Sequence, residues 1–143
     1  APAFACFINP DDQRFAGPNN MSAKIQAFCG ETGQRVPQTK GEIIRCVYES
    51  LAMRYRWALD GMERATGQTF ACLHIIGGGS QDSFLDELTA KAAGVTVLAG
   101  PKEATAIGNL LVQMIAAGEV KDVAEGRELV KRSFGVRTYE SKN

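Results

Sequence analysis

The segment over residues 73–93 constrains the fold of this chain more than any other part of the sequence. The apolar run over residues 70–76 is short and bounded by turn residues, which predicts a strand covered on both faces. Residues 77–79 are three glycines, which allow positive φ angles and the close approach of another molecule to the backbone. Ser80 or Asp82 can cap the helix that follows. The apolar stripe of that helix contains Phe84, Leu85 and Leu88.

The glycine turn differs from the two common phosphate-binding loops. A dinucleotide fingerprint counted from Gly77 requires a glycine at the position that Asp82 occupies, and the P-loop sequence Gly-Lys-Ser/Thr is absent. The N-terminus of the following helix is still a suitable environment for an anion. Two interpretations stay open: the glycines serve only the geometry of a tight turn, or they admit a ligand.

Composition limits the class of protein and the partners it can have. A chain of 143 residues, 45% hydrophobic and 22% charged, fits one soluble globular domain. The net charge of zero argues against a nucleic acid or an anionic membrane surface as a partner, because both usually require a basic face. No apolar run approaches the roughly 20 residues of a membrane span, and we expect no secretory signal at the start of the chain.

The four cysteines do not have the spacing of a common metal site. No Cys-x-x-Cys pair occurs, and His74 is the one histidine, so we expect no metal ligands in this chain. Cys29 and Cys46 flank a loop containing glycines and a proline, and we expect them to approach each other and to be the pair that forms any disulfide. Cys6 and Cys72 lie on separate extended segments, where we expect small buried hydrophobic residues.

The first half of the chain is organised around one long helix. We expect an irregular lead-in over residues 1–38, with a short helix over residues 21–28 that ends at Gly30. Thr39 and Glu42 form a capping box, so the long helix begins there and runs to residue 66. Its apolar stripe contains Ile43, Ile44, Val47, Tyr48, Leu51, Tyr55, Ala58, Leu59 and Met62. Its charged residues, which we expect on a solvated face, are Arg45, Glu49, Arg54, Arg56 and Glu63.

The second half predicts two parallel strands joined through a helix. A second strand over residues 95–98 is followed by a helix over residues 102–117, with Pro101 near its first turn. The buried face of this helix contains Ile107, Leu110, Leu111, Met114 and Ile115. Asp122 caps a last helix that runs to Phe134, with apolar contacts from Val123, Leu129 and Val130. The expected organisation is one domain over residues 1–143, with an α/β core over residues 39–134 and a polar tail over residues 135–143.

Five stretches together resemble the C-terminal domain of the FGGY carbohydrate kinases. They are residues 8–15 (INPDDQRF), 49–52 (ESLA), 55–57 (YRW), 74–81 (HIIGGGSQ) and 99–109 (AGPKEATAIGN). The resemblance extends from about Phe4 to Val120, and within the family it is greatest to the kinases that phosphorylate L-rhamnulose. It implies the actin-like, ribonuclease-H-like ATPase fold, here without its first strands, because two parallel strands are few for so much helix.

The resemblance also implies a nucleotide site on the glycine turn. Its residues would be Gly77, Gly78, Gly79, Ser80, Gln81 and Asp82, with Gly78 nearest the nucleotide and Gln81 beside the adenine. Family members often have Asn where this chain has Asp82, which accepts but cannot donate a hydrogen bond when it is ionised. The implied cofactors are ATP and Mg²⁺, and the implied partners are a sugar and an N-terminal kinase domain in a cytoplasmic enzyme.

Such kinases transfer the γ-phosphoryl group of ATP to a sugar hydroxyl, with an Asp as the base. The base and the phosphate-binding segment of the family match nothing in this sequence, so we expect no catalytic residue here and an inactive chain on its own. His74 is expected to be a structural strand residue. The alternative function is a non-catalytic nucleotide-binding or interaction module of the same ATPase superfamily.

Overall fold

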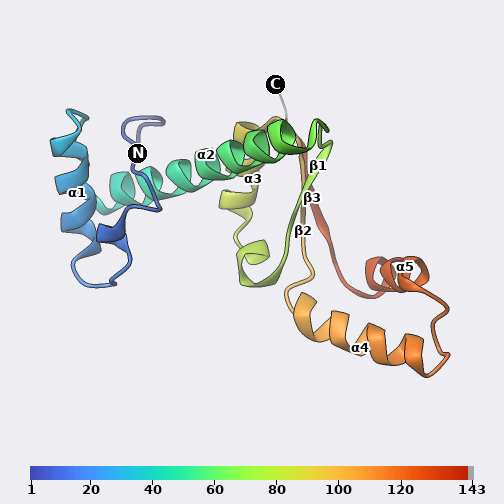
Figure 1. Cartoon of the computed structure of the whole chain (residues 1–143). Helices are drawn as coiled ribbons and strands as arrows, with labels where there is room; N and C mark the ends of the chain where they lie inside the picture. The colour runs from blue at the N-terminus through green and yellow to red at the C-terminus, as the bar shows by residue number, and fades with distance from the viewer. Residues whose placement is uncertain (142–143) are drawn as a thin grey trace. The chain divides into compact units, whose positions relative to one another are not determined.

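The computed structural model describes residues 1–141, and their contacts divide the chain into two compact units, Ala1–Thr69 and Phe70–Asn143 (Figure 1). The predicted α/β class is confirmed by five α-helices and a small mixed sheet among the described residues. The organisation as a single domain with a lead-in, a core and a tail stays a prediction. None of the helices over residues 1–141 is both long enough and apolar enough to cross a membrane.

The first unit contains one short and two longer helical segments, which are η1 (Gln13–Phe15), α1 (Met21–Glu31) and α2 (Lys40–Thr66). Helix α1 runs past Gly30, where the sequence predicts its end, and reaches its C-cap at Thr32. Asn20 is at the N-cap in a left-handed conformation, and its side chain makes no capping hydrogen bond. A glycine inside a helix is tolerated where the packed residues around it keep the helix in place.

The start and the end of α2 are confirmed. The Thr39 hydroxyl accepts a hydrogen bond from the Glu42 N–H at 3.2 Å, and the Glu42 carboxylate accepts one from the Thr39 N–H at 3.0 Å. Gly67 follows the last turn with a φ of 67° and donates its N–H to the Glu63 carbonyl at 2.9 Å. Both ends therefore satisfy backbone groups that a helix otherwise leaves without partners.

Two polar residues of α2 hold the N-terminal segment, so the prediction of a solvated face at Glu49 is wrong. The Glu49 side chain is 2% exposed and accepts hydrogen bonds from the Phe4 N–H and from Arg45 Nε, both at 2.8 Å. The buried Ser50 hydroxyl accepts a hydrogen bond from the Ile8 N–H at 2.9 Å. The N-terminal segment has no regular secondary structure here, and these side chains supply acceptors for its backbone donors.

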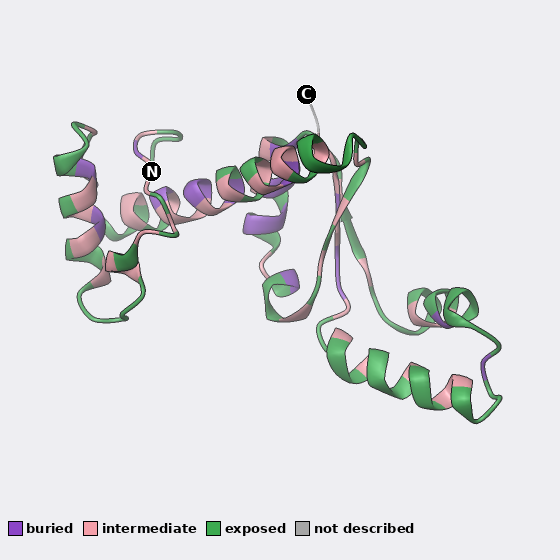
Figure 2. Cartoon of the chain, viewed as in Figure 1, coloured by how far each residue is buried: buried purple, intermediate pink, exposed green. Residues whose placement is uncertain are grey.

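Part of the apolar stripe predicted for α2 is exposed in the structure. Ile44, Tyr55 and Met62 lie on the surface, whereas Cys46, Ala52 and Leu59 are buried (Figure 2). The hydrophobic core of this unit gathers where α1 and the N-terminal segment pack on the first turns of α2, with Ile43 and Val47 at its edge. A helix of 27 residues is longer than the segments that cover it in this unit, so its stripe is only partly buried.

The second unit is built on a three-stranded sheet. Its elements are β1 (Cys72–Ile75), η2 (Gly77–Gln81), α3 (Ser83–Ala93), β2 (Thr96–Ala99), α4 (Ala104–Ala116), α5 (Val123–Ser133) and β3 (Arg137–Tyr139). The predicted parallel pair is confirmed, because β1 pairs with β2 in parallel, with Cys72 opposite Thr96. The residues predicted as a polar tail include a further strand, β3, which pairs antiparallel with β2, with Thr138 opposite Leu98. Three residues are too few for an alternating pattern to identify a strand.

The prediction that β1 is covered on both faces is also wrong. Its residues alternate, with Leu73 and Ile75 half-buried and Cys72 and His74 exposed. Strand β2 lies between the other two and is more buried, since Val97 is inaccessible to solvent. His74 is a residue of β1, as predicted, and lies on its exposed face.

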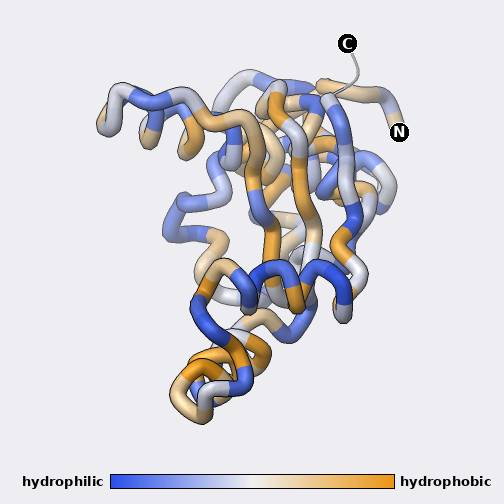
Figure 3. Tube along the Cα trace, turned by 90° about the vertical axis from the view of Figure 1, so that its right-hand side faces the viewer, coloured by the Kyte–Doolittle hydropathy of each residue, from blue (hydrophilic) through white to orange (hydrophobic). Residues whose placement is uncertain are grey.

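Helices α4 and α5 pack against each other and are otherwise open to solvent (Figure 2). Helix α4 begins at Ala104, two residues after the start predicted from the sequence. The prediction of a buried face is wrong, because no residue of α4 is fully buried and Leu110 is 56% exposed, although α4 is strongly apolar (Figure 3). A Cβ on Gly126 of α5 would lie 3.3 Å from a methyl carbon of Leu111, so this glycine permits close helix packing.

Candidate functional site

The glycine segment, residues 77–79, follows β1 in the second unit and is hydrogen-bonded to the residues that follow β2. Gly77 has a φ of 74°, a conformation that favours glycine, and donates its N–H to the Pro101 carbonyl at 3.2 Å. The Gly100 N–H donates to the Ile75 carbonyl at 2.8 Å. These bonds continue the β1–β2 pairing past the last strand residues and place the glycines at the carboxyl end of the sheet. Ligands of open parallel sheets commonly bind at that edge.

The first turn after β1 is a 3-10 helix, and its second and third glycines face solvent. A Cβ built on Gly78 would meet no heavy atom within 4 Å. A Cβ on Gly79 would meet the Ile75 side chain at 3.6 Å, which is ordinary contact. The φ of Gly78 also lies outside the left-handed range. No contact within the described chain therefore requires glycine at position 78, and the space above its backbone is open to another molecule.

Ser80 stabilises the glycine segment from inside. It is fully buried, and its hydroxyl donates to the Gly77 carbonyl at 2.7 Å and accepts from Gln81 Nε2 at 3.2 Å. The guanidinium of Arg137, on β3, donates to the Ser80 carbonyl. Gln81 itself is exposed. Of the six residues predicted to bind nucleotide, Ser80 thus faces the protein, and Gly78, Gly79 and Gln81 face solvent.

Of the two caps predicted for α3, Ser80 and Asp82, the structure has Asp82. Its Oδ1 accepts a hydrogen bond from the Leu85 N–H at 3.1 Å, and its side chain is half-buried. A carboxylate at this position also interacts favourably with the positive end of the helix dipole. Because this oxygen is engaged with the helix, Asp82 offers less of its carboxylate to a ligand than a free side chain would.

Two buried polar side chains on α3 were not identified from the sequence. Neither the Asp86 carboxyl nor the Thr89 hydroxyl has a hydrogen-bond partner among the described residues, and both side chains are fully buried. Burial raises the pKa of Asp86 above its ordinary value, and the Asp82 charge acts in the same direction, whereas the Arg137 guanidinium opposes the shift. The sequence feature that could have indicated their burial is spacing, since Asp86, Thr89, Ala90 and Ala93 lie on one face of the helix.

A separate hollow lies in the first unit, beside α2. It has a volume of about 630 Å³ and is lined by the stretch from Phe7 to Asp11 and by residues of α2. Trp57 is 59% exposed at this hollow, with the Arg54 guanidinium 3.8 Å from the centre of its ring. Arg54 also pairs with Asp11, so its charge is neutralised within the unit.

The cysteines are arranged partly as predicted. The sulfurs of Cys29 and Cys46 approach each other as expected, but Cys6 joins them, and all three sulfurs lie within 4.8 Å of one another. The three thiols are free in this structure, and the choice of pair for a disulfide stays a prediction. The prediction that Cys72 is buried is wrong, because it lies on the exposed face of β1.

Comparison with known proteins connects both units to one group of enzymes. Residues 1–117 match the model of the FGGY family of carbohydrate kinases, C-terminal domain. The chain is 47% identical over 136 residues to the rhamnulokinase of Bacteroides thetaiotaomicron, covering 95% of this chain and 28% of the relative. It is 47% identical over 140 residues to the rhamnulokinase of Bacillus subtilis, covering 98% of this chain and 29% of the relative. The chain therefore spans less than a third of the length of these relatives.

Proposed function

The chain belongs to the FGGY family of carbohydrate kinases, and from this membership we propose that it is the nucleotide-binding part of an ATP-dependent kinase for L-rhamnulose. The product of the whole enzyme would be L-rhamnulose 1-phosphate, with ADP released. The choice of sugar rests on the rhamnulokinase relatives and on their identity of 40–47% across nearly the whole chain. We also propose the actin-like ATPase fold and a cytoplasmic location for the complete enzyme.

The proposed nucleotide site is the segment over residues 77–82. One observation carries this assignment: Gly78 is exposed at the carboxyl end of the parallel strands, and no protein atom lies where its Cβ would be. Gln81 is exposed beside it and has an amide that can donate to and accept from an adenine edge. The buried Ser80 contributes by keeping the turn rigid, through its bond to the Gly77 carbonyl.

The chemistry of the reaction requires residues outside this chain. Bound ATP with Mg²⁺ supplies the γ-phosphoryl group and neutralises its charge in such transfers. The role of this chain is to bind the nucleotide and to orient it against the backbone of the glycine segment. We assign no base and no Mg²⁺ ligand to residues 1–143, and we propose that both belong to the N-terminal kinase domain.

The glycine assignment is tested in the complete kinase with Gly78→Val. The new side chain enters open space, so the fold is retained, but it fills the space where the nucleotide would lie. We expect the Michaelis constant for ATP to rise at least tenfold, corresponding to about 1.4 kcal/mol of lost binding, with the melting temperature nearly unchanged. The control is Gly61→Val on α2, whose Cβ would meet only the Arg64 side chain at 3.9 Å. An unchanged constant in Gly78→Val would return the glycine to a purely structural role.

The division of labour is tested with the chain alone. We expect calorimetric titration with ADP to show weak binding that Gly78→Val abolishes, and sugar-dependent ATP hydrolysis to be undetectable. Phosphorylation of L-rhamnulose at an enzyme-like rate by this chain would contradict the placement of the base in another domain.

A further inference from the structure

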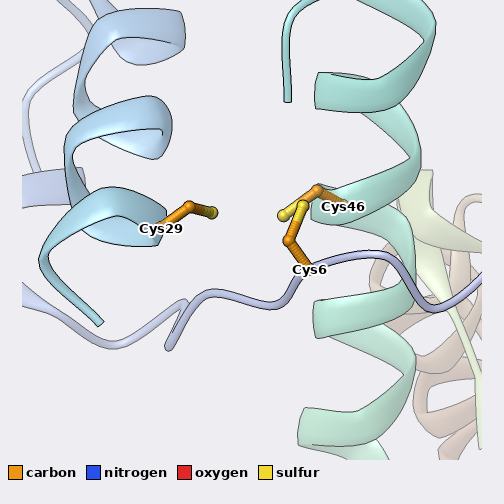
Figure 4. A group of neighbouring side chains, drawn as sticks. All are labelled: Cys6, Cys29 and Cys46. Atoms are coloured by element: carbon orange, nitrogen blue, oxygen red, sulfur yellow. The ribbon is translucent and has the colours of Figure 1, made fainter. Parts of the chain in front are cut away.

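Three cysteines of the first unit form a cluster that the nucleotide site does not use. Cys6 comes from the N-terminal segment, Cys29 from the last turn of α1 and Cys46 from the second turn of α2. Their sulfurs all lie within 4.8 Å of one another, and each residue is at most 4% exposed. In Figure 4 the Cys29 side chain points from α1 toward the sulfurs of the other two. Three segments far apart in sequence thus converge on one point through their thiols.

The surroundings of the cluster are those of a hydrophobic core. Ile25 is buried with the three cysteines, and the side chains packed around them include Phe15, Met21, Ile43 and Val47. No histidine or carboxylate joins the group within residues 1–141. The Ser50 hydroxyl is close by but is engaged with the Cys46 carbonyl at 2.6 Å. The cluster therefore offers three sulfur ligands and no fourth acidic or imidazole ligand.

We propose that Cys6, Cys29 and Cys46 form a three-coordinate binding site for trivalent arsenic, taken up as arsenous acid. In the reaction, As(OH)₃ and three thiols give a trithiolate complex and three water molecules. Three As–O and three S–H bonds break, and three As–S and three O–H bonds form. Nothing is oxidised or reduced, and no net charge or proton is released.

Charge decides in favour of a trivalent ion. Three thiolates carry three negative charges, so copper(I) would leave two of them uncompensated and zinc would leave one. The arsenic complex is neutral, and a neutral complex avoids the penalty for placing net charge in a core. The three thiols are buried in a hydrophobic core, where an uncompensated thiolate is disfavoured.

The distances suit three bonds to one atom. With a bond near the roughly 2.3 Å of metal–thiolate contacts, a pyramidal complex requires sulfurs about 3.5 Å apart. Since the sulfurs lie at most 4.8 Å apart, no pair has to approach by more than about 1.3 Å, which side-chain rotation can supply. A disulfide would instead bring two sulfurs to about 2 Å and leave the third thiol without a role.

The test titrates the reduced, intact protein with sodium arsenite in the absence of oxygen. We expect native mass spectrometry to show one arsenic per chain in place of three protons. After unfolding, iodoacetamide should then alkylate Cys72 and leave the three cluster cysteines protected, as mapped by peptide mass. Alkylation of all four cysteines despite arsenite, or protection of a set that includes Cys72, would overturn the proposal.

Variants separate the cluster from the exposed thiol. Cys72→Ser should bind arsenite as the unchanged protein does, whereas Cys6→Ser, Cys29→Ser and Cys46→Ser should each lose affinity on the order of a hundredfold, because one of three linked bonds is removed. The peptide map of the unchanged protein remains decisive if a cluster variant fails to fold. Displacement of bound arsenic by equimolar Zn²⁺ or copper(I) would refute the charge argument.

Discussion

The buried Glu49 should contribute far more to stability than an ion pair of the same geometry on the surface of the same helix. Glu49 accepts from the Phe4 N–H and from Arg45 Nε, both at 2.8 Å. Glu49→Gln removes the negative charge and leaves one acceptor oxygen for the two donors, the Phe4 N–H and Arg45 Nε. The new amide NH₂ adds donors at a place where only an acceptor is needed. Hydrogen bonds to charged groups are worth about 1.5–3 kcal/mol each, so the loss of one gives about 2 kcal/mol.

The matched control is the pair of Arg56 and Asp60, which has the same i to i+4 spacing on α2 and the same 2.8 Å distance from Arg Nε. Their side chains are 41% and 32% exposed, and exposed pairs contribute roughly 0–1 kcal/mol. Asp60→Asn should therefore change stability by only a few tenths of a kcal/mol. The two pairs share donor type, spacing and distance, so the comparison reports the effect of burial together with the Phe4 hydrogen bond.

The assay is urea unfolding followed by the fluorescence of Trp57, the single tryptophan and itself a residue of α2. With an m-value near 2 kcal/mol/M, Glu49→Gln should lower the midpoint by about 1 M and Asp60→Asn by roughly 0.2 M. Equal small shifts in both variants would refute the argument that the N-terminal segment is held by Glu49.

Three further outcomes follow from the structure. Gly100→Ala should lower the free energy of unfolding in urea by about 3 kcal/mol, because the residue has a φ of 121° and its Cβ would lie 2.9 Å from the Gly135 carbonyl oxygen. Gly78→Ala is the control and should be nearly neutral, so similar losses in both variants would contradict the prediction. The raised pKa of Asp86 means that its own contribution to stability is fully present below pH 3.8 and is lost as the pH rises through the folded-state pKa. Asp86→Asn should therefore remove this fall from the dependence of the melting temperature on pH, and an unchanged dependence would count against it. Cys72 should react rapidly with a thiol reagent in the folded protein and Cys29 only on unfolding, and fast labelling of Cys29 would disprove its burial.

The elements predicted well from the sequence are those whose signals are local. The capping box at Thr39, the glycine at position 67 and the cap at Asp122 each involve residues a few positions apart, and all three are confirmed. Parallel pairing of two short strands also followed from the order of elements, because a helix between two strands favours the parallel arrangement.

The features that were missed depend on contacts between distant segments. The burial of Glu49 follows from the Phe4 backbone donor, 45 positions away, which no helical periodicity can reveal. Strand β3 is recognisable only through its pairing with β2, and Cys6 reaches the other thiols only because the N-terminal segment is held on α2. At the candidate site, the sequence predicted the glycine turn after β1, but not that Ser80 turns inward while Gln81 stays exposed.

The position of β1 at one end of the strand order has a consequence for handling this chain. Within residues 1–141, β1 pairs with β2 on one side and with no strand on the other. A strand with an open side presents backbone donors and acceptors to any extended peptide, including a second copy of itself. Its outward residues, Cys72 and His74, include no proline or fixed charge to discourage such pairing. Concentrated solutions of the isolated chain should therefore associate through this strand, and a lysine in place of His74 is the simplest way to keep the chains apart.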